Sequence, residues 1–367
     1  MIPSTEPRGA GAVLTVDPAA VAANWATLCA RHPGGAVAGV VKADAYGLGA
    51  ALIAPRLHAA GCRHFFVAQL EEALAIRDLL PGAMLAVLNG LLPGTAADYA
   101  ARDIAPVLGS LGEVDAWARQ ARRAGRRLPA LLHVDTGMAR LGLDARELDA
   151  LAADHARLDG IALRYAMTHL VSAEQADDPM NAAQLARFAD ACARLPPAPR
   201  SLANSSGIFL GAAYGSDLAR PGAALYGINP VPGQPNPMRD TVRLEARVLQ
   251  VREIGPGETV GYNATWRAAR PSRIGTVGLG YADGLLRSLS NRGAAFFDGR
   301  PVPLVGRVSM DMTTFDVTEY PAIGPGSWLE IIGPHCPPDR LAEAAGTNGY
   351  EILTSLGRRY ARVAAGA

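Results

Sequence analysis

Eight short apolar runs, separated by alanine-rich stretches that favour helices, constrain the fold of this 367-residue chain more than any other feature. Each run is apolar almost throughout and is followed by a helix candidate, as expected of parallel strands covered on both faces. The runs lie at 36–41, 64–68, 84–89, 104–108, 128–134, 161–169, 200–204 and 218–222. This pattern predicts an α/β protein with an N-terminal (β/α)8 barrel, a fold that typically takes ~250 residues.

The character of the sequence changes after a stretch at 229–237, where prolines recur too often for a helix or a central strand. Strand-like segments follow it, with Asp298-Gly299 as a candidate tight turn of a hairpin. These segments are VRLEARVLQVREI, IGTVGLGYADG, AAFFDGRPVPLVG and SWLEIIG. We therefore expect a barrel domain over residues 1–236 and a mainly β domain over residues 237–367.

Composition excludes several classes of partner. The 35 basic residues nearly match the 34 acidic ones, which leaves no surplus charge for nucleic acid or an anionic membrane. The opening MIPSTEPRGAGAVLT lacks a basic region followed by an apolar core, and no stretch is long and apolar enough for a membrane span, so we expect a cytoplasmic protein. The four cysteines lack the spacing of a disulfide framework or a metal site, and no metal is expected.

Lys42 is the only lysine in the chain, and the other 34 basic residues are arginines. It stands in VVKADAYGLG, where the first apolar run gives way to a turn, so a barrel would place it at the C-terminal rim where reactive groups gather. A Schiff base needs a primary amine that can lose its proton, which arginine cannot provide. The alternative is a single lysine that survived by chance as a surface charge.

Two segments follow the seventh and eighth runs, where such barrels commonly bind phosphate: Ala203–Gly207, which contains Asn204 and Ser205, and Arg220–Ala224. Their small residues would let backbone amides approach an anion. Taken alone, the NSSG sequence is also an ordinary loop with a helix cap.

The motif around Lys42 is very similar to the lysine signature of alanine racemases, which use pyridoxal 5'-phosphate (PLP). The resemblance continues in family order through VDTGMARLG, MTHLVSAE, LANSSG, RPGAALYG, VGYNATW, GLGYADG, GRVSMDM and GYEILTSLGRRYARV, and so spans nearly the whole chain. It implies that Lys42 carries PLP and acts as one base, and that Tyr262 is the second base. Racemisation demands bases on opposite faces, because a proton taken from one face of Cα must return to the other.

The resemblance also implies the surroundings of the cofactor. Arg220 would face the pyridine nitrogen, which disfavours transamination, and His169 with Arg220 would tune Tyr262, whose reference pKa is about 10. The positions that match the cofactor-binding residues are Lys42, Tyr46, His169, Asn204, Ser205, Arg220, Gly222, Ala223 and Tyr350. On the residues alone, Tyr262 reads as a half-buried strand tyrosine and Arg220 as a salt-bridge residue.

Four positions match the substrate-binding residues of the family. Arg140 and the Met310 amide would contact the substrate carboxylate. Tyr281 and Tyr350 would narrow the entrance, and Asp311 would lie beside them. Read without the resemblance, Met310 is a core methionine, Tyr281 a packing aromatic and Asp311 a turn carboxylate.

One position departs from the family. Well-known members have a carbamylated lysine two residues before the aspartate of the DTGM motif, and its negative charge braces the arginine that matches Arg140. Here that position is His133, which is neutral or cationic near neutral pH. Arg140 is therefore expected to pair with a small anion such as chloride, or with a nearby carboxylate.

The resemblance implies a homodimer with shared active sites that interconverts L-alanine and D-alanine, for peptidoglycan synthesis or for alanine catabolism. Two alternatives remain at this point. A racemase for serine or for a broader set of amino acids fits the same frame, because a small pocket rejects an added hydroxyl only weakly. A non-enzymatic PLP-binding protein would share the barrel but lack a second domain.

Overall fold

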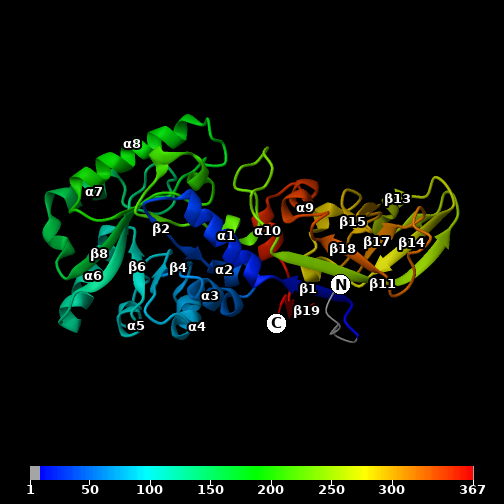
Figure 1. Cartoon of the computed structure of the whole chain (residues 1–367), viewed down its shortest axis with the longest axis horizontal. Coiled ribbons are helices and arrows are strands. Elements are labelled where there is room, and N and C mark those ends of the chain that lie inside the picture. The colour runs from blue at the N-terminus through cyan, green and yellow to red at the C-terminus, as the bar shows by residue number, and fades with distance from the viewer. Residues whose placement is uncertain (1–8, 367) are drawn as a thin grey trace. The chain divides into compact units, whose positions relative to one another are not determined.

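The structure, a computed structural model, describes residues 9–366 and divides the chain into two compact units (Figure 1). One unit spans Val21–Arg239, and the other combines the segment from Asp240 onward with the N-terminal residues up to Ala20. Residues 1–8, on which the expectation about the opening segment partly rests, lie outside the described residues. No helix within the described part of the chain is long and apolar enough to cross a lipid bilayer.

The first unit is the predicted barrel. Its parallel strands are β2 (Ala36–Val37), β3 (Gly39–Val40), β4 (His64–Val67), β5 (Met84–Val87), β6 (Ala105–Leu108), β7 (Leu128–His133), β8 (Ile161–Met167), β9 (Arg200–Ser201) and β10 (Leu218–Ala219). The strands β2 and β3 are two halves of the first apolar run, because β2 pairs with the last strand, β10, and β3 pairs with β4. The sheet therefore closes on itself through its first strand, and all eight predicted runs form strands.

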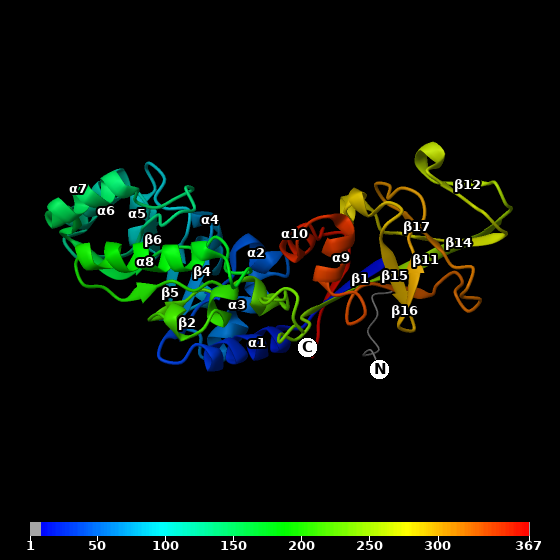
Figure 2. The same cartoon turned by 90° about the horizontal axis from the view of Figure 1, so that it is seen from above.

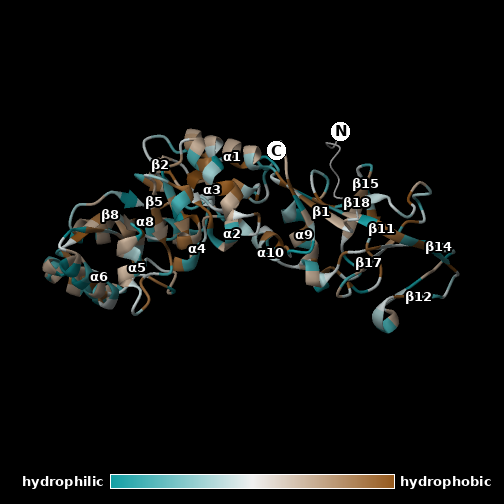
Figure 3. Ribbon diagram, turned by 90° about the horizontal axis from the view of Figure 1, so that it is seen from below, coloured by the Kyte–Doolittle hydropathy of each residue, from teal (hydrophilic) through white to brown (hydrophobic). Residues whose placement is uncertain are grey.

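Helices cover the outside of the barrel (Figures 1 and 2). They are α1 (Pro18–Arg31), α3 (Ala50–Ala59), α4 (Leu70–Ile76), α5 (Ala96–Ala101), α6 (Leu111–Ala124), α7 (Ala145–Ala153) and α8 (Pro179–Arg194). The connections between strands also contain the short element α2 (Lys42–Tyr46) and the 3-10 turns η1 (Arg77–Leu79), η2 (His155–Leu158), η3 (Ser206–Phe209), η4 (Ala212–Tyr214) and η5 (Ala223–Tyr226). The helix α6 illustrates why these helices pack against the strands. Val114, Trp117 and Ala121 recur at helical spacing and are buried, while the other face of the helix is polar (Figure 3). The Ser110 side chain caps its first turn by accepting from the Glu113 amide.

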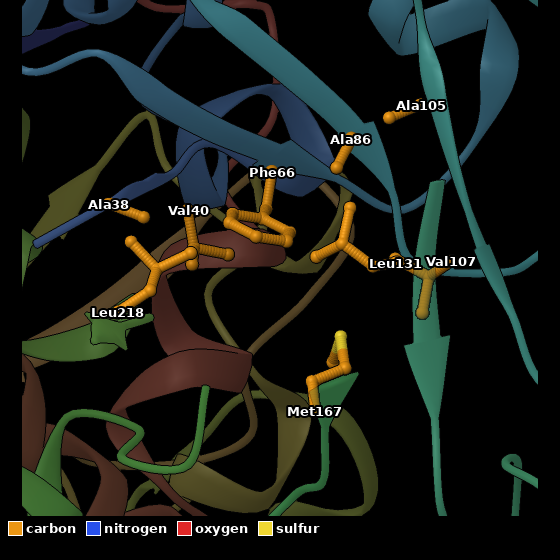
Figure 4. Packing of buried hydrophobic residues seen from close by; sticks show 9 residues of the cluster. All are labelled: Ala38, Val40, Phe66, Ala86, Ala105, Val107, Leu131, Met167 and Leu218. Atoms are coloured by element: carbon orange, nitrogen blue, oxygen red, sulfur yellow. The ribbon is translucent and has the colours of Figure 1, made fainter. Parts of the chain in front are cut away.

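The interior of the barrel is a packed apolar core (Figure 4). Phe66 lies among smaller side chains that come from nearly every strand, so the barrel has no open channel there. The buried members of this cluster are Ala38, Val40, Phe66, Ala86, Ala105, Val107, Leu131, Met167 and Leu218. Because this core fixes the strands, it also fixes the positions of the loops at their C-terminal ends.

The second unit is mainly β, as predicted. It contains β1 (Ala12–Val16), β11 (Val242–Ile254), β12 (Thr259–Val260), β13 (Trp266–Arg267), β14 (Ser272–Val277), β15 (Ala294–Phe297), β16 (Arg300–Pro303), β17 (Thr313–Asp316), β18 (Trp328–Ile332) and β19 (Ala361–Ala364), the helices α9 (Pro338–Ala345) and α10 (Gly349–Thr354), and the 3-10 turns η6 (Tyr262–Ala264), η7 (Tyr281–Asp283) and η8 (Arg287–Leu289). The Asp298-Gly299 turn joins β15 to β16, and both residues have positive φ, at 47° and 75°.

The N-terminal segment differs from the expected domain boundaries. Residues Ala12–Val16 form β1, which pairs antiparallel with β11 and parallel with β19 and so belongs to the β unit. Its side chains alternate between buried and half-buried, as in a strand with one face on a core. The barrel unit ends at Arg239 and the β unit resumes at Asp240, so this boundary lies three residues beyond the expected one at 236/237. The described chain therefore contributes β1 to the β unit, then forms the barrel, and then forms the rest of the β unit.

Candidate active site

Lys42 lies at the C-terminal end of β3, after Val41, whose amide donates to the Phe66 carbonyl at 2.8 Å. The four residues that follow it, Ala43 to Tyr46, all have φ between 52° and 54°. The element labelled α2 is therefore a left-handed turn, although none of these four residues is glycine. Such a conformation costs roughly 1–2 kcal/mol per residue, and strain of this kind is typical of functional sites.

The environment of Lys42 favours its neutral form. Burial lowers the pKa of the Lys42 amine, the charge of Arg140 lowers it further, and Glu72 partly opposes both effects. Because the unprotonated amine is the nucleophile toward an aldehyde, this shift suits a lysine that forms a covalent imine. Its partial burial and its lowered pKa distinguish Lys42 from an ordinary exposed lysine.

Tyr46, Ser205 and Gly222 meet beside this turn. The Ser205 hydroxyl accepts hydrogen bonds from the Gly222 amide at 3.1 Å and the Ala224 amide at 3.2 Å. A Cβ atom on Gly222 would stand 2.2 Å from the Tyr46 hydroxyl, so only glycine fits there. Burial raises the pKa of Tyr46 to about 12, which keeps its hydroxyl protonated as a hydrogen-bond donor. Small residues, amides and two hydroxyls are thus gathered in one place, a set that suits a phosphate group.

Ala223 and Asn204, which flank Gly222 and Ser205 in the sequence, have different contacts. Ala223 is buried and begins η5, which places its backbone next to Gly222. Asn204 accepts from the Gly207 amide at 2.9 Å, so its side chain serves as a cap for the turn that follows β9. The ordinary role that the NSSG sequence suggests is therefore present at Asn204, while Ser205 contacts the backbone of the next loop.

Arg220 is buried, and no described carboxylate forms an ion pair with it. It donates to the Ser201 hydroxyl and to the Thr168 carbonyl, both at 2.5 Å. Burial lowers its pKa to about 10, so the guanidinium remains charged near neutral pH. The reading of Arg220 as a salt-bridge residue is wrong within the described chain. A buried cation without an anionic partner fits a site that takes an electron-rich ligand.

His133 and His169 lie close to Arg220. Burial is the main reason that the pKa of His133 falls to about 4 and that of His169 to about 3, and the charge of Arg220 is the next contribution in both cases. Both imidazoles are therefore neutral near neutral pH. Lys42 and Arg140 also act on His169, which places all of these groups around one positively charged site.

Arg140 lies in the loop after β7 and is exposed. The Asp135 carboxylate shapes this loop by accepting from the amides of Gly137 and Met138, both at 2.9 Å. No described acidic side chain forms an ion pair with Arg140. The carboxylate that was considered as a partner of Arg140 is therefore not paired with it among the described residues.

The predicted site residues of the β unit lie on its surface. Tyr262 is 69% exposed in η6, between β12 and β13, so it is not a half-buried strand tyrosine. Met310 is 53% exposed and is not a core methionine, and Tyr281 is 42% exposed. Tyr350 is half-buried in α10.

The structure brings Tyr281, Met310 and Asp311 together. The Tyr281 amide donates to the Ser309 carbonyl at 3.0 Å, and the next amide donates to the Met310 carbonyl at 3.0 Å. The turns that carry these residues therefore lie side by side, as the resemblance implies for a shared entrance.

Arg359 joins these two turns, and sequence reasoning missed it. Its Nε and Nη2 atoms donate to the two oxygens of the buried Asp283 carboxylate at 2.7 and 2.9 Å, and its Nη1 donates to Asp311 at 2.7 Å. The Gly280 amide donates to the same Asp283 carboxylate at 2.9 Å. Among 34 arginines only position in the GRRYARV motif could have singled it out.

Comparisons with known proteins agree with this architecture. The model of the alanine racemase N-terminal domain matches residues 16–230, and that of the C-terminal domain matches residues 241–364. The chain is 61% identical to the alanine racemase of Acidiphilium cryptum over 350 residues, which cover 95% of this chain and 98% of the relative. It is 52% identical to the alanine racemase of Rhodospirillum rubrum over 357 residues, which cover 96% of each chain.

Solved structures give the same result. A crystal structure of the alanine racemase from Bartonella henselae with covalently bound pyridoxal phosphate superposes with a TM-score of 0.94 at 42% identity, over 97% of this chain and 99% of that one. The biosynthetic alanine racemase of Pseudomonas aeruginosa superposes with a TM-score of 0.90 at 33% identity, over 97% and 99% of the two chains. With both domain models matched and relatives of this identity over nearly the full length, the chain belongs to the alanine racemase family.

Proposed function

We propose that this protein interconverts L-alanine and D-alanine with PLP bound to Lys42. The observation that carries the proposal is the only lysine of the chain, held at the barrel rim with a lowered pKa, beside a cluster suited to phosphate and a buried, unpaired guanidinium. Following α-hydrogen exchange across a panel of amino acids in heavy water would test it. Exchange of alanine is expected, and exchange of serine at a comparable rate would favour the broader racemase.

The residues of the barrel unit would hold the cofactor. The Tyr46 and Ser205 hydroxyls and the Ala223 amide would bind its phosphate, with Tyr350 added from a β unit. Gly222 would leave room for the phosphate beside Tyr46, and its amide donates to Ser205. Asn204 would shape the loop that carries Ser205, and His169 would line the site. Bound PLP supplies an electron sink that makes the Cα hydrogen of an attached amino acid acidic.

Arg220 would set the electronic character of the cofactor. Its guanidinium stays protonated, so it would donate a hydrogen bond to the pyridine nitrogen of the cofactor and leave that nitrogen without a proton. A guanidinium in this role would make the bound cofactor less electron-withdrawing, which would disfavour transamination. Support comes from the burial of Arg220 and its lack of a carboxylate partner among the described residues.

Lys42 and Tyr262 would act as the two bases. One of the two groups would take a proton from Cα, and the other would return a proton on the opposite face, with the roles exchanged in the reverse direction. The neutral His169 would be the hydrogen-bonding neighbour of Tyr262. The exposure of Tyr262 in its own unit supports a role toward another surface. We infer that this surface is the barrel of a second copy, in a homodimer with shared sites.

Arg140 and the Met310 amide would bind the substrate carboxylate, and Tyr281, Tyr350 and Asp311 would limit the size of the entrance. The β unit argues against a single-domain PLP-binding protein that is not an enzyme, since such a protein lacks these residues. The four cysteines are free thiols, which fits a cytoplasmic location. The D-alanine formed would serve peptidoglycan synthesis, and the reverse direction would serve alanine catabolism.

Activity is expected to be indifferent to bicarbonate. His133 has a pKa near 4 and is neutral at working pH, so it can neither carry a carbamate nor supply a negative charge. Racemisation rates measured after removing and restoring bicarbonate should agree, whereas a His133→Lys variant should gain a response to it. If chloride braces Arg140, exchange of halide for a bulky anion should lower the rate. A marked bicarbonate response of the unmodified protein would contradict this account.

Arg359→Lys is expected to raise the KM for alanine by about tenfold, because lysine cannot contact both oxygens of Asp283 and also reach Asp311. Loss of the clamp would let the turn that carries Met310 shift relative to Tyr281. Steady-state kinetics would measure the effect, with a smaller change in kcat than in KM. Arg358→Lys is the control, since Arg358 is the exposed neighbour and has no such contacts. Equal kinetics of the two variants would refute the role.

A further inference from the structure

We propose that Glu72, on α4, is a positioning residue that holds the left-handed turn behind Lys42 in place and brings a negative charge to the residue that follows Lys42. The inference rests on the proposed role of Lys42 as the PLP lysine. Glu72 is not among the residues that the family resemblance assigned, and its place at the start of a helix suggests only a capping role.

The contacts of Glu72 reach in two directions. Its Oε1 atom accepts a hydrogen bond from the Ala43 amide at 2.6 Å. Its Oε2 atom accepts from the Ala68 amide at 2.8 Å and the Gln69 amide at 3.1 Å, at the end of β4 and the start of α4. One carboxylate therefore ties the residue after Lys42 to the neighbouring strand and helix. Hydrogen bonds to a charged acceptor are the strong ones.

The left-handed turn over residues 43–46 requires contacts that hold its backbone in place. Ala43, Asp44, Ala45 and Tyr46 are all left-handed without being glycine, so this backbone persists only where its surroundings hold it. Asp44 secures the far end by accepting from the Ala50 amide at 2.7 Å. Glu72 secures the near end, next to Lys42. Without it the turn would be free to relax, and the lysine would move with it.

Charge points to the same residue. The charge of Arg140, in the loop after β7, disfavours protonation of Lys42, while His169, in the loop after β8, is neutral. Glu72 is the group that opposes Arg140 and raises the pKa of the Lys42 amine. A carboxylate that anchors the turn and also raises the pKa of the Lys42 amine would therefore influence both the position and the protonation of Lys42.

Glu72→Gln tests the electrostatic part. Because Lys42 is the only lysine, acylation by acetic anhydride at that residue can be followed by mass spectrometry of its peptide in the PLP-free full-length protein. The pH profile of Lys42 acylation is expected to shift to lower pH in Glu72→Gln. It should stay unchanged in Glu71→Gln, which removes the same charge from the exposed neighbour on α4. Profiles of Glu72→Gln and unmodified protein that coincide would overturn this part.

The affinity for PLP tests the positional part. A glutamine side chain can no longer accept in both directions, so PLP is expected to bind about tenfold more weakly. Ala43→Gly should restore that affinity in the double variant, since glycine adopts a positive φ without strain and the Ala43 methyl is exposed. The double variant should keep the shifted acylation profile. Weak binding that glycine does not restore would show that Glu72 does not hold the turn.

The design separates this inference from the proposed function. Failure of the unmodified protein to bind PLP would defeat the proposed function, whereas Lys42 acylation needs no cofactor. If Glu72→Gln does not fold, Glu72→Asp keeps the charge but is one methylene too short to span both sides. It should then bind PLP weakly with a near-normal acylation profile, and normal PLP binding would refute the clamp.

Discussion

Lys42→Arg is expected to lower alanine racemisation by more than about 10⁴-fold, the upper range for the loss of one general base, because the cofactor link is lost as well. Arginine keeps the positive charge, and Lys42 is only half-buried, so the fold should survive. Purified unmodified protein should be yellow, and borohydride should fix PLP irreversibly on Lys42. The variant should be colourless and unlabelled, with an unchanged circular dichroism spectrum.

A second lysine provides the control for this experiment. Arg146 is exposed in the first turn of α7, and Arg146→Lys combined with Lys42→Arg leaves one lysine in the wrong place at the same net charge. This double variant should remain inactive and unlabelled. Racemisation by this double variant would show that the position of the amine does not matter, and this would contradict the proposed role of Lys42.

The sequence was sufficient to predict the barrel because most of its strands lie in nearly continuous apolar runs that are followed by helix-forming residues. The short strand β10 is buried at both residues, whereas β9 is Arg200–Ser201 and was predicted from the run at 200–204 that contains it. Prediction from the sequence failed at β1, which pairs with β11 more than 220 residues away. Local periodicity cannot report the partner of a strand, so the N-terminal segment was placed in the wrong unit.

The site shows a similar division. Lys42 was predicted from its uniqueness together with its place at the end of the first apolar run, and the residues of the β unit were predicted from the family resemblance. The left-handed turn had no signal, because the residues ADAY carry no glycine to mark a positive φ. Glu72 and Arg359 act through backbone amides and other side chains, so their residue types alone do not distinguish them from a helix cap and a surface charge.

Tyr262→Phe is expected to lower racemisation by about 10²–10⁴-fold while PLP binding is retained. The change removes only a hydroxyl from a side chain that is exposed in its own unit, so the stability of the fold should not suffer. Loss should affect both directions, since each requires one proton transfer on the Tyr262 face. Absorbance of bound PLP and progress curves from either enantiomer would measure these effects. Near-normal rates would remove Tyr262 from the mechanism.

Mixing this variant with Arg140→Ala would show whether the site is shared between subunits. If Arg140 and Tyr262 of one site come from different chains, each mixed dimer contains one intact site and one site with both defects. Random exchange of equal amounts makes half of the dimers mixed, so about one quarter of the normal activity should return. Subunits must first be allowed to exchange, and each variant incubated with itself serves as the control. If every site is built from a single chain, no mixed dimer has an intact site, and the mixture should stay as inactive as its components.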